Sequence, residues 1–536
     1  MEIVQVVITA ALSLLQILHP PYTLATFFDN LSAQQTIYFL ALIRFEEVKM
    51  FKYISTLFLV FGLLACSSSD SDKENPPPVA DPDQFKALQQ VIESDLQENN
   101  AVAVSVAIYH QGKIVYAEAF GEKVKDSGEP VTPNTLFQLG STTKMHTGLA
   151  TLQLIQQGQL NLEDKLVLIL PDIQYPDEQM SGWQDVNIQH LLTHQGGFRD
   201  TYVGADADSS LVEYMTLTYP QQNSQMNRPG IFYNYSNPNW SYLGAIIEYL
   251  SQSPYTEYMK SNVFESLGMS RTTMGRAEVV SDGDFAIGFQ DIDGEGVFLE
   301  DISQIAETPS ILPAGSETWS TPTEQLKMAE FLLNGNSNIL TDQLRSEITK
   351  PQVDIEFAGL PQNYGYGIYT DEGFMYNDLW YPEKVWHHAG GTYAHTSLFW
   401  ILPEKGVAVS IMSSGHANDF EASMIAALNS VIDLPTPVEV PFAPSDSDEY
   451  EIHEGSYIAD GLTIIVNQEN DGLTISMPEL DANDIPYENT LYPVGDTTFA
   501  AAIDNEELLL TFLPESEGGE SVYLRHRNLV GIKVGY

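Results

Sequence analysis

The chain reads Phe137-Gln138-Leu139-Gly140-Ser141-Thr142-Thr143-Lys144 at the point where an apolar stretch of helical period begins, and that stretch continues to about residue 157. On a helix, side chains three positions apart project from one face, so Ser141 and Lys144 are expected to share a pocket near the helix N-terminus. First-turn amides and the helix dipole favour negative charge there, and a lysine of lowered pKa accepts the proton of the hydroxyl. The pattern favours a nucleophilic serine with a lysine activator.

Two further motifs follow in the chain and strengthen this interpretation. Ser-x-x-Lys alone occurs by chance about once or twice in an unrelated chain of this length. Here Tyr235-Ser236-Asn237 and His388-Ala389-Gly390-Gly391 come after it in that order. Together the three motifs resemble the Ser-x-x-Lys, Tyr-x-Asn and His-x-Gly elements of class C serine β-lactamases, D,D-carboxypeptidases of the penicillin-binding group, and related esterases and D-aminopeptidases. The resemblance spans residues 85 to about 432.

The resemblance implies a role for each motif residue. Ser141 is the expected nucleophile, Lys144 its activating partner, and Tyr235 the phenol that relays protons to and from the leaving group. Asn237 is expected to orient Lys144 or the substrate. A phenol beside an ammonium ionises more easily than its ordinary pKa near 10 suggests, so Tyr235 is a second candidate base. The sequence leaves open whether Lys144 or Tyr235 takes the first proton.

The third motif bears on the substrate. The resemblance assigns the oxyanion hole to the amides of Ser141 and Gly391, and Gly390 and Gly391 let backbone approach the substrate closely. His388 stands where class C β-lactamases have the lysine of Lys-Thr-Gly, which removes a permanent cation for a β-lactam carboxylate. This departure favours a peptidase, esterase or amidase over efficient antibiotic hydrolysis. His194, near a helix end, is interpreted as a structural or supporting histidine.

Composition limits the classes of function. The chain has 536 residues, 43% of them hydrophobic, which is enough for a large core and two or three domains. A formal charge of -50 would repel nucleic acid, so we predict no such partner and attribute the acidity to solubility. A small-molecule or peptide substrate is expected instead. No group of His, Cys, Asp or Glu has metal-ligand spacing, and we predict no metal and no cofactor.

The single cysteine excludes an internal disulfide and ends an apparent targeting signal. From Met50, a lysine-containing start leads into an apolar run and then Leu63-Leu64-Ala65-Cys66. This resembles a bacterial lipobox, which implies a mature chain that begins at Cys66 and carries lipid there. We therefore predict a signal peptide over residues 50–66, a solvated linker over residues 67–83, and a lipid-anchored location in the cell envelope, periplasmic or at the outer membrane.

Residues 1–49 precede a complete signal with its own methionine, so we interpret them as a misassigned extension, with an N-terminal anchor helix as the alternative. Residues 84–434 form the predicted catalytic domain. Its strand-like runs lie at Ala101–Tyr109, Lys113–Phe120 and between residues 385 and 413, on either side of a mostly helical insert. Such an order implies one sheet built from both ends of the domain.

A proline-rich linker over residues 435–447 leads to residues 448–536, where short β-type runs at close spacing predict a small all-β domain without a recognisable catalytic motif. The predicted fold class is therefore α/β of the α+β type. It combines a β-lactamase and D,D-peptidase-like antiparallel sheet flanked by helices, a helical subdomain, and a small C-terminal all-β domain.

The sequence thus predicts a lipid-anchored serine hydrolase that forms an acyl-enzyme on an ester, amide or D-amino-acid peptide. The alternative is a catalytically silent lipoprotein of the cell envelope that binds or senses its ligand. Competent residues at all three motifs argue against that alternative. A carbohydrate-binding protein would rest on tyrosine content alone, and scattered tyrosines more often serve packing.

Intact-mass measurement of the expressed protein tests the N-terminal interpretation. We expect a mature chain that begins at Cys66 and carries added lipid mass, because processing removes the residues before the lipobox cysteine. An unprocessed protein that starts at Met1 would contradict the assignment of the start to Met50.

Overall fold

The computed structural model describes residues 84–535, except for 176–179, 201–209, 224, 293–294, 300, 305–317, 356–359, 361, 416–417, 441–446, 470–471, 505, 516–518 and 528. Cys66, the predicted extension, the signal peptide and the N-terminal linker all lie outside the described residues, as does part of the 435–447 linker. Within the described part of the chain, every helix is too short or too polar to cross a membrane.

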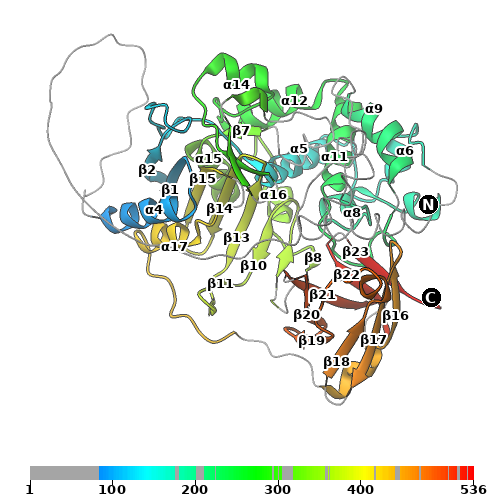
Figure 1. The fold of residues 1–536 in the computed structure, drawn as a ribbon. Coiled ribbons are helices and arrows are strands. Elements are labelled where there is room, and N and C mark those ends of the chain that lie inside the picture. The colour runs from blue at the N-terminus through cyan, green and yellow to red at the C-terminus, as the bar shows by residue number, and fades with distance from the viewer. Residues whose placement is uncertain are drawn as a thin grey trace, which may run out of the picture.

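The centre of the catalytic domain is an antiparallel sheet built from both ends of the domain, as predicted (Figure 1). In spatial order its strands are β2 (Lys113–Gly121), β1 (Ala103–His110), β15 (Val407–Ser414), β14 (His395–Leu402), β13 (Val385–Gly391), β10 (Tyr369–Asp371), β9 (Asn363–Tyr364) and β8 (Val353–Asp354). Strand β1 joins the two halves, because it pairs with β2 on one side and β15 on the other. Strands β1 and β2 form a hairpin, with Gln111 and Gly112 both at positive φ in its turn.

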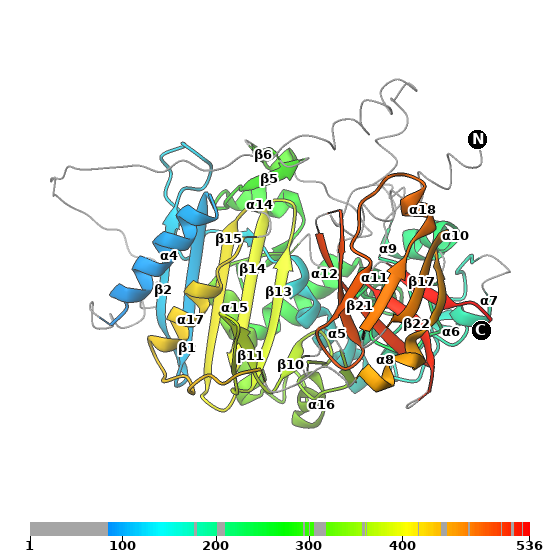
Figure 2. The same ribbon diagram turned by 60° about the horizontal axis from the view of Figure 1, so that its bottom comes forward.

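Both faces of the sheet are covered, which explains why its central strands are apolar without clear alternation. Every residue of β15 is buried, whereas the edge strand β2 is mostly half-buried or exposed. Helices α4 (Lys86–Glu98) and α17 (Glu421–Asn429) cover one face and lie side by side in Figure 2. Helix α15 (Pro322–Asn334) packs on the opposite face, against β1 and β15.

The helical insert packs around α5 (Lys144–Gln156) and α11 (Asn237–Ser251). Helix α5 is buried on nearly every side, which suits its continuous apolar sequence. Its N-terminus differs from the prediction, because Ser141 lies in a 3₁₀ turn, Gly140–Thr143, that precedes the α-helix. The shorter helices of the insert are α6 (Leu166–Ile169), α7 (Met180–Trp183), α8 (Ile188–Leu192), α9 (Leu211–Glu213), α10 (Tyr219–Gln222), α12 (Tyr255–Tyr258), α13 (Glu265–Leu267), α14 (Arg276–Asp282) and α16 (Asp342–Ile348).

The region before Gly335 also contains short strands, where sequence analysis predicted mostly helical or irregular structure. These strands are β3 (Phe137–Gln138), β4 (Thr273–Met274), β5 (Phe289–Ile292), β6 (Glu295–Phe298) and β7 (Thr318–Ser320), and a small hairpin, β11 (Phe374–Tyr376) and β12 (Leu379–Tyr381), follows later. Strand β7 pairs with both β3 and β4, so segments distant in sequence meet immediately before Ser141. Strands of two or three residues carry too little periodicity to be recognised from sequence.

The C-terminal all-β prediction is confirmed, and the strands close into a barrel. The barrel comprises β16 (Gly455–Ala459), β17 (Leu462–Glu469), β18 (Gly472–Ser476), β19 (Thr490–Pro493), β20 (Thr498–Ile503), β21 (Glu506–Pro514), β22 (Ser521–His526) and β23 (Leu529–Lys533), with α18 (Pro478–Asp481) between β18 and β19. Pairing of β16 with β23 closes the barrel and removes the sheet edges.

The barrel packs against the helical subdomain through an apolar contact. Phe232 and Tyr523 meet at a ring distance of 5.2 Å, and they belong to a buried cluster that also contains Met226, Leu513, Val522 and Val530. In Figure 1 the barrel, coloured orange to red, lies next to α8 and to the β8 end of the main sheet. Arg525 also crosses this interface, where its guanidinium donates to the carbonyl oxygens of Tyr233 and Ile355. The barrel is therefore docked on the catalytic domain through buried contacts.

Phe512 tests the barrel core. Its side chain is fully buried against Phe499, Tyr457 and His453. We expect Phe512→Ala to lower the free energy of unfolding by about 3–5 kcal/mol, because the change removes buried area and leaves a cavity. Denaturant unfolding measures the loss. Ile458→Ala is the matched control in the same barrel, since Ile458 is 50% exposed, and equal losses in the two variants would contradict this packing.

Candidate active site

A tight backbone turn presents Ser141. Strand β3 leads into Leu139, whose amide donates to the carbonyl oxygen of Thr318 at 2.9 Å. Gly140 follows at φ +55°, and a Cβ there would lie 2.7 Å from the amide nitrogen of Gly391. Only glycine both tolerates this φ and leaves room for so close an approach. The position of β13 therefore requires glycine immediately before the serine.

Strands β13 and β14 hold the serine turn from the other side. The hydroxyl of Ser397 donates to the carbonyl oxygen of Leu139 at 2.6 Å and lies 2.7 Å from the hydroxyl of Thr142. A Cβ on Gly390 would lie 1.9 Å from the Leu139 oxygen and 2.9 Å from the Ser141 amide nitrogen. The two segments that carry the predicted oxyanion donors, the amides of Ser141 and Gly391, are thus in backbone contact.

Lys144 lies where the sequence predicted it, one helical turn beyond Ser141. Its ammonium nitrogen is within hydrogen-bond distance of Ser141 Oγ, at 3.0 Å, and of Asn237 Oδ1, at 2.7 Å. The side chain is fully buried. Burial lowers the pKa of Lys144 well below its usual value, the charge of Asp200 opposes that change, and the charge of Arg527 adds to it. A neutral amine next to the hydroxyl can accept its proton.

Tyr235 completes the contact with the nucleophile. Interaction of its hydroxyl with the Ser141 side chain acts to lower the pKa of the phenol. The ring stacks on His194 at 4.2 Å between centroids, and the Lys144 nitrogen lies 5.0 Å from its centre. Burial raises the pKa of Tyr235 above its usual value, although the bond with Ser141 and the nearby Arg527 act in the opposite direction. The expectation that this phenol ionises easily is therefore wrong, because desolvation outweighs the neighbouring cations.

Asn237 connects the lysine to a carboxylate that sequence analysis did not single out. It begins helix α11, and its backbone amide donates to Asp200 Oδ1 at 3.0 Å. Its side-chain amide lies 3.4 Å from Asp200 Oδ2, which leaves Oδ1 of Asn237 to accept from Lys144. The amide orientation is thus set by the carboxylate. Asp200 lies in a loop without a recognisable motif, so no local signal in the sequence marked it.

His388 lies in an aromatic wall next to these residues. It is almost fully buried, and its Nδ1 lies 2.6 Å from the Ala389 carbonyl oxygen. That nitrogen must therefore carry the proton, which leaves Nε2 to accept from the Tyr364 hydroxyl at 3.3 Å. Burial, with the nearby Lys144, lowers the pKa of His388 to about 3. The imidazole is therefore neutral and contributes no cation where the related β-lactamases have lysine.

His194 supports the site from behind Tyr235, as the sequence interpretation expected. It is fully buried at φ +56°. The indole N–H of Trp240 points at Nε2 at 2.9 Å, and Nδ1 lies 2.9 Å from the backbone nitrogen of Ser236 and 3.1 Å from its carbonyl oxygen. Burial lowers the pKa of His194 well below its usual value. A fixed neutral imidazole therefore sets the plane of the Tyr235 ring.

The barrel contributes Arg527, which sequence analysis missed. It lies in the turn after β22, where its guanidinium bonds to Asp200 Oδ2 at 2.5 Å and its central carbon lies 4.6 Å from the centre of the Tyr235 ring. A weak signal was present, because Arg525 and Arg527 fall within three residues in a chain with only 23 lysines and arginines. Sequence analysis recognised no catalytic motif in the barrel, yet through this contact the barrel reaches the residues around Ser141.

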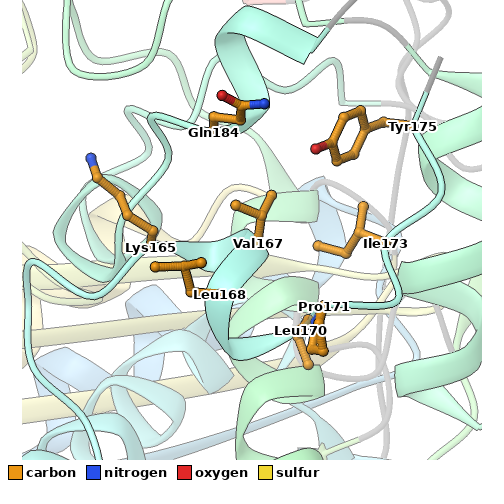
Figure 3. Close-up of a pocket in the computed structure, with 8 residues that line it drawn as sticks. All are labelled: Lys165, Val167, Leu168, Leu170, Pro171, Ile173, Tyr175 and Gln184. Atoms are coloured by element: carbon orange, nitrogen blue, oxygen red, sulfur yellow. The ribbon is translucent and has the colours of Figure 1, made fainter. Parts of the chain in front are cut away.

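A separate hollow of about 400 Å³ lies beside α6. Figure 3 shows its lining residues, which are Lys165, Val167, Leu168, Leu170, Pro171, Ile173, Tyr175 and Gln184. None of them belongs to the three motifs, so the hollow is distinct from the serine site. Over the described residues, no group of three or more His, Cys, Asp or Glu is arranged to hold a metal ion.

Comparison with known families agrees with this geometry. The sequence profile of the family described as Beta-lactamase matches residues 88–431, more than half of the chain. The protein belongs to the β-lactamase family. The matched region includes all three motifs and ends before the barrel. The resemblance inferred from the motifs is therefore confirmed at the level of the family.

Individual family relatives are distant. Protein flp of Staphylococcus aureus strain NCTC 8325 is 24% identical over 354 residues, covering 65% of this chain and 67% of its own. Penicillin-binding protein 4* of Bacillus subtilis is 25% identical over 473 residues, covering 82% of this chain and 98% of its own. Among solved structures, SurE matches 85% of this chain and 100% of its own at 20% identity, with a TM-score of 0.65. At that identity the likeness shows the fold alone.

The two glycines of the third motif offer a paired test of the site geometry. We expect Gly390→Ala to cost roughly 1–3 kcal/mol of stability, because its Cβ would overlap the Leu139 carbonyl and displace the serine turn. Gly391→Ala should retain the wild-type melting temperature, since its Cβ would meet no atom within 4 Å. Thermal unfolding compares the pair, and equal melting temperatures would rule out this backbone approach.

Proposed function

We propose that the protein is a serine hydrolase that forms an acyl-enzyme on Ser141. The observation that carries the proposal is the contact between a fully buried Lys144 amine and Ser141 Oγ at 3.0 Å. A purely structural role does not explain this contact, because a serine hydroxyl can be buried without a lysine beside it. Burying an ammonium is also costly in free energy unless it loses its proton or is paired. A neutral amine beside a serine is the arrangement that nucleophilic catalysis requires.

Acylation uses groups that lie around Ser141. Lys144 takes the Ser141 proton as Oγ attacks the substrate carbonyl carbon, and the amides of Ser141 and Gly391 stabilise the oxyanion. Tyr235 donates its proton to the leaving group when the carbonyl carbon–leaving group bond breaks, and it regains a proton from the Lys144 ammonium. In deacylation water replaces the leaving group, and the same groups act in the reverse direction. The raised pKa of Tyr235 suits a proton donor.

The third motif supports an ester, amide or D-amino-acid peptide as the substrate. His388 is neutral and hydrogen-bonded to protein groups, so it offers no cation to a β-lactam carboxylate. A relative is named a penicillin-binding protein, and a second SurE structure contains D-Leu. These names are compatible with substrates related to D-amino acids. We also propose that a lipid on Cys66 anchors the enzyme in the cell envelope, a proposal that rests on the lipobox pattern.

A fluorophosphonate probe tests the nucleophile. We expect intact mass to show one adduct on the wild-type protein, none on Ser141→Ala, and labelling at least about 10²-fold slower in Lys144→Ala, since the proton acceptor is lost. Because Lys144 is active when neutral, the labelling rate should fall as the pH drops through its lowered pKa. Labelling should therefore persist at pH values where an ordinary lysine is fully charged.

The matched control is Lys260→Ala, which removes an exposed lysine and should label at the wild-type rate. A folded wild-type protein that takes no label would contradict the proposal. It would favour instead a binding or sensing lipoprotein that keeps the fold without turnover.

A further inference from the structure

Arg527 reaches the catalytic residues from a different domain. It is 327 positions away from Asp200 in the chain, yet the two side chains form an ion pair with an N–O distance of 2.5 Å. The Asp200 side chain is only 4% exposed, which makes an unpaired carboxylate there costly. The turn between β22 and β23 therefore supplies the counter-charge for a buried acid of the helical subdomain.

The ion pair continues into the catalytic residues without a break. Asp200 accepts from the backbone amide of Asn237 at 3.0 Å, and Asn237 Oδ1 accepts from Lys144 at 2.7 Å. Lys144 in turn contacts Ser141 Oγ at 3.0 Å. Asp200 and Asn237 therefore connect Arg527 to the amine that activates the nucleophile, so removing the charge of Arg527 should affect that amine.

The position of Arg527 is fixed by the docking of the barrel. Its own carbonyl oxygen accepts from the Asn234 side chain at 2.9 Å. Two residues earlier, Arg525 donates to the carbonyl oxygens of Tyr233 and Ile355. The end of β22 and the turn after it thus both bind the segment that carries Tyr235, which restricts the position of the Arg527 guanidinium.

Asp200 and Arg527 are the charged groups that face Lys144 among the described residues. His194 and His388 also lie near it, but burial lowers the pKa of both, so they are neutral. Tyr235 is neutral because burial raises its pKa. Alone, the Asp200 carboxylate would hold a proton on Lys144, and Arg527 opposes that effect.

We propose that Arg527 is a positioning residue of the acyl-transfer site, through which the barrel neutralises Asp200 and so keeps Asn237 and Lys144 in the arrangement that activates Ser141. The inference rests on the proposed function, because it assigns the barrel a part in the same reaction. On this view the barrel completes the active site, in addition to packing against it.

The pH dependence of fluorophosphonate labelling of the full chain tests this inference. Arg527→Gln keeps a hydrogen-bond donor but removes the charge that lowers the pKa of Lys144. The pH at which the labelling rate falls to half on the acid side should therefore rise by about one unit. We expect no larger shift, because 38% of the Arg527 side chain is exposed and water screens its charge. Arg527→Lys retains the cation and should keep the wild-type midpoint.

A variant of the other residue of the ion pair, Asp200, should shift the acid-side midpoint of the labelling rate in the opposite direction. Asp200→Asn removes the anion that favours a charged Lys144 but leaves an oxygen to accept from Asn237, so the midpoint should fall. A purely structural ion pair would lower the melting temperature of both variants and leave both midpoints at the wild-type value. Arg228→Gln is the matched control, since Arg228 pairs with Glu515 across the same domain interface and is 75% exposed.

The outcomes separate the two proposals. If the wild-type protein labels and both charge variants keep its midpoint, the inference about Arg527 is overturned while the acyl-enzyme proposal stands. If the wild-type protein takes no label, both fail together. Should Arg527→Gln not fold, the direction of the shift in Asp200→Asn alone decides, because an unchanged or raised midpoint contradicts the proposal.

Discussion

The whole site depends on burying one amine. Lys144 is removed from water, and an ammonium in that position is unstable unless charges and hydrogen bonds around it compensate. The protein instead favours the neutral amine, and it sets the remaining partners accordingly: Asn237 turns its oxygen toward the amine, and the nearby imidazoles are neutral. Because these neighbours are buried as well, their charges and that of Lys144 influence one another's pKa values.

The second constraint is a backbone contact between the two halves of the catalytic domain. The serine turn belongs to the helical insert, whereas Gly390 lies on a strand from the C-terminal part of the domain. They approach so closely that no side chain fits at Gly140 or Gly390. A sheet assembled from both ends of the domain brings β13 to this point, so the topology of the sheet is what places the predicted oxyanion donors together.

The barrel adds cations to a chain that has few. The chain has a net charge of -50, and the Asp200 side chain is only 4% exposed, so its carboxylate needs a partner. Arg527 supplies it, while Arg525 satisfies carbonyl oxygens at the same interface. Because Arg525 at the end of β22 and Arg527 in the following turn are close in the chain, a single docking contact joins the domains and sets the electrostatics next to Tyr235. The domain interface and the active site are therefore one continuous structure.

By itself, the sequence determined the motifs, the longer helices and strands, and the all-β nature of the C-terminus, because these depend on local periodicity and on residue types at short spacing. Tertiary structure alone decided the closure of the barrel, the pairing of Asp200 with Arg527, and the raised pKa of Tyr235. Each of these depends on residues that are far apart in the chain, or on burial. A local pattern reports neither, since burial and long-range contacts exist only once the chain has folded.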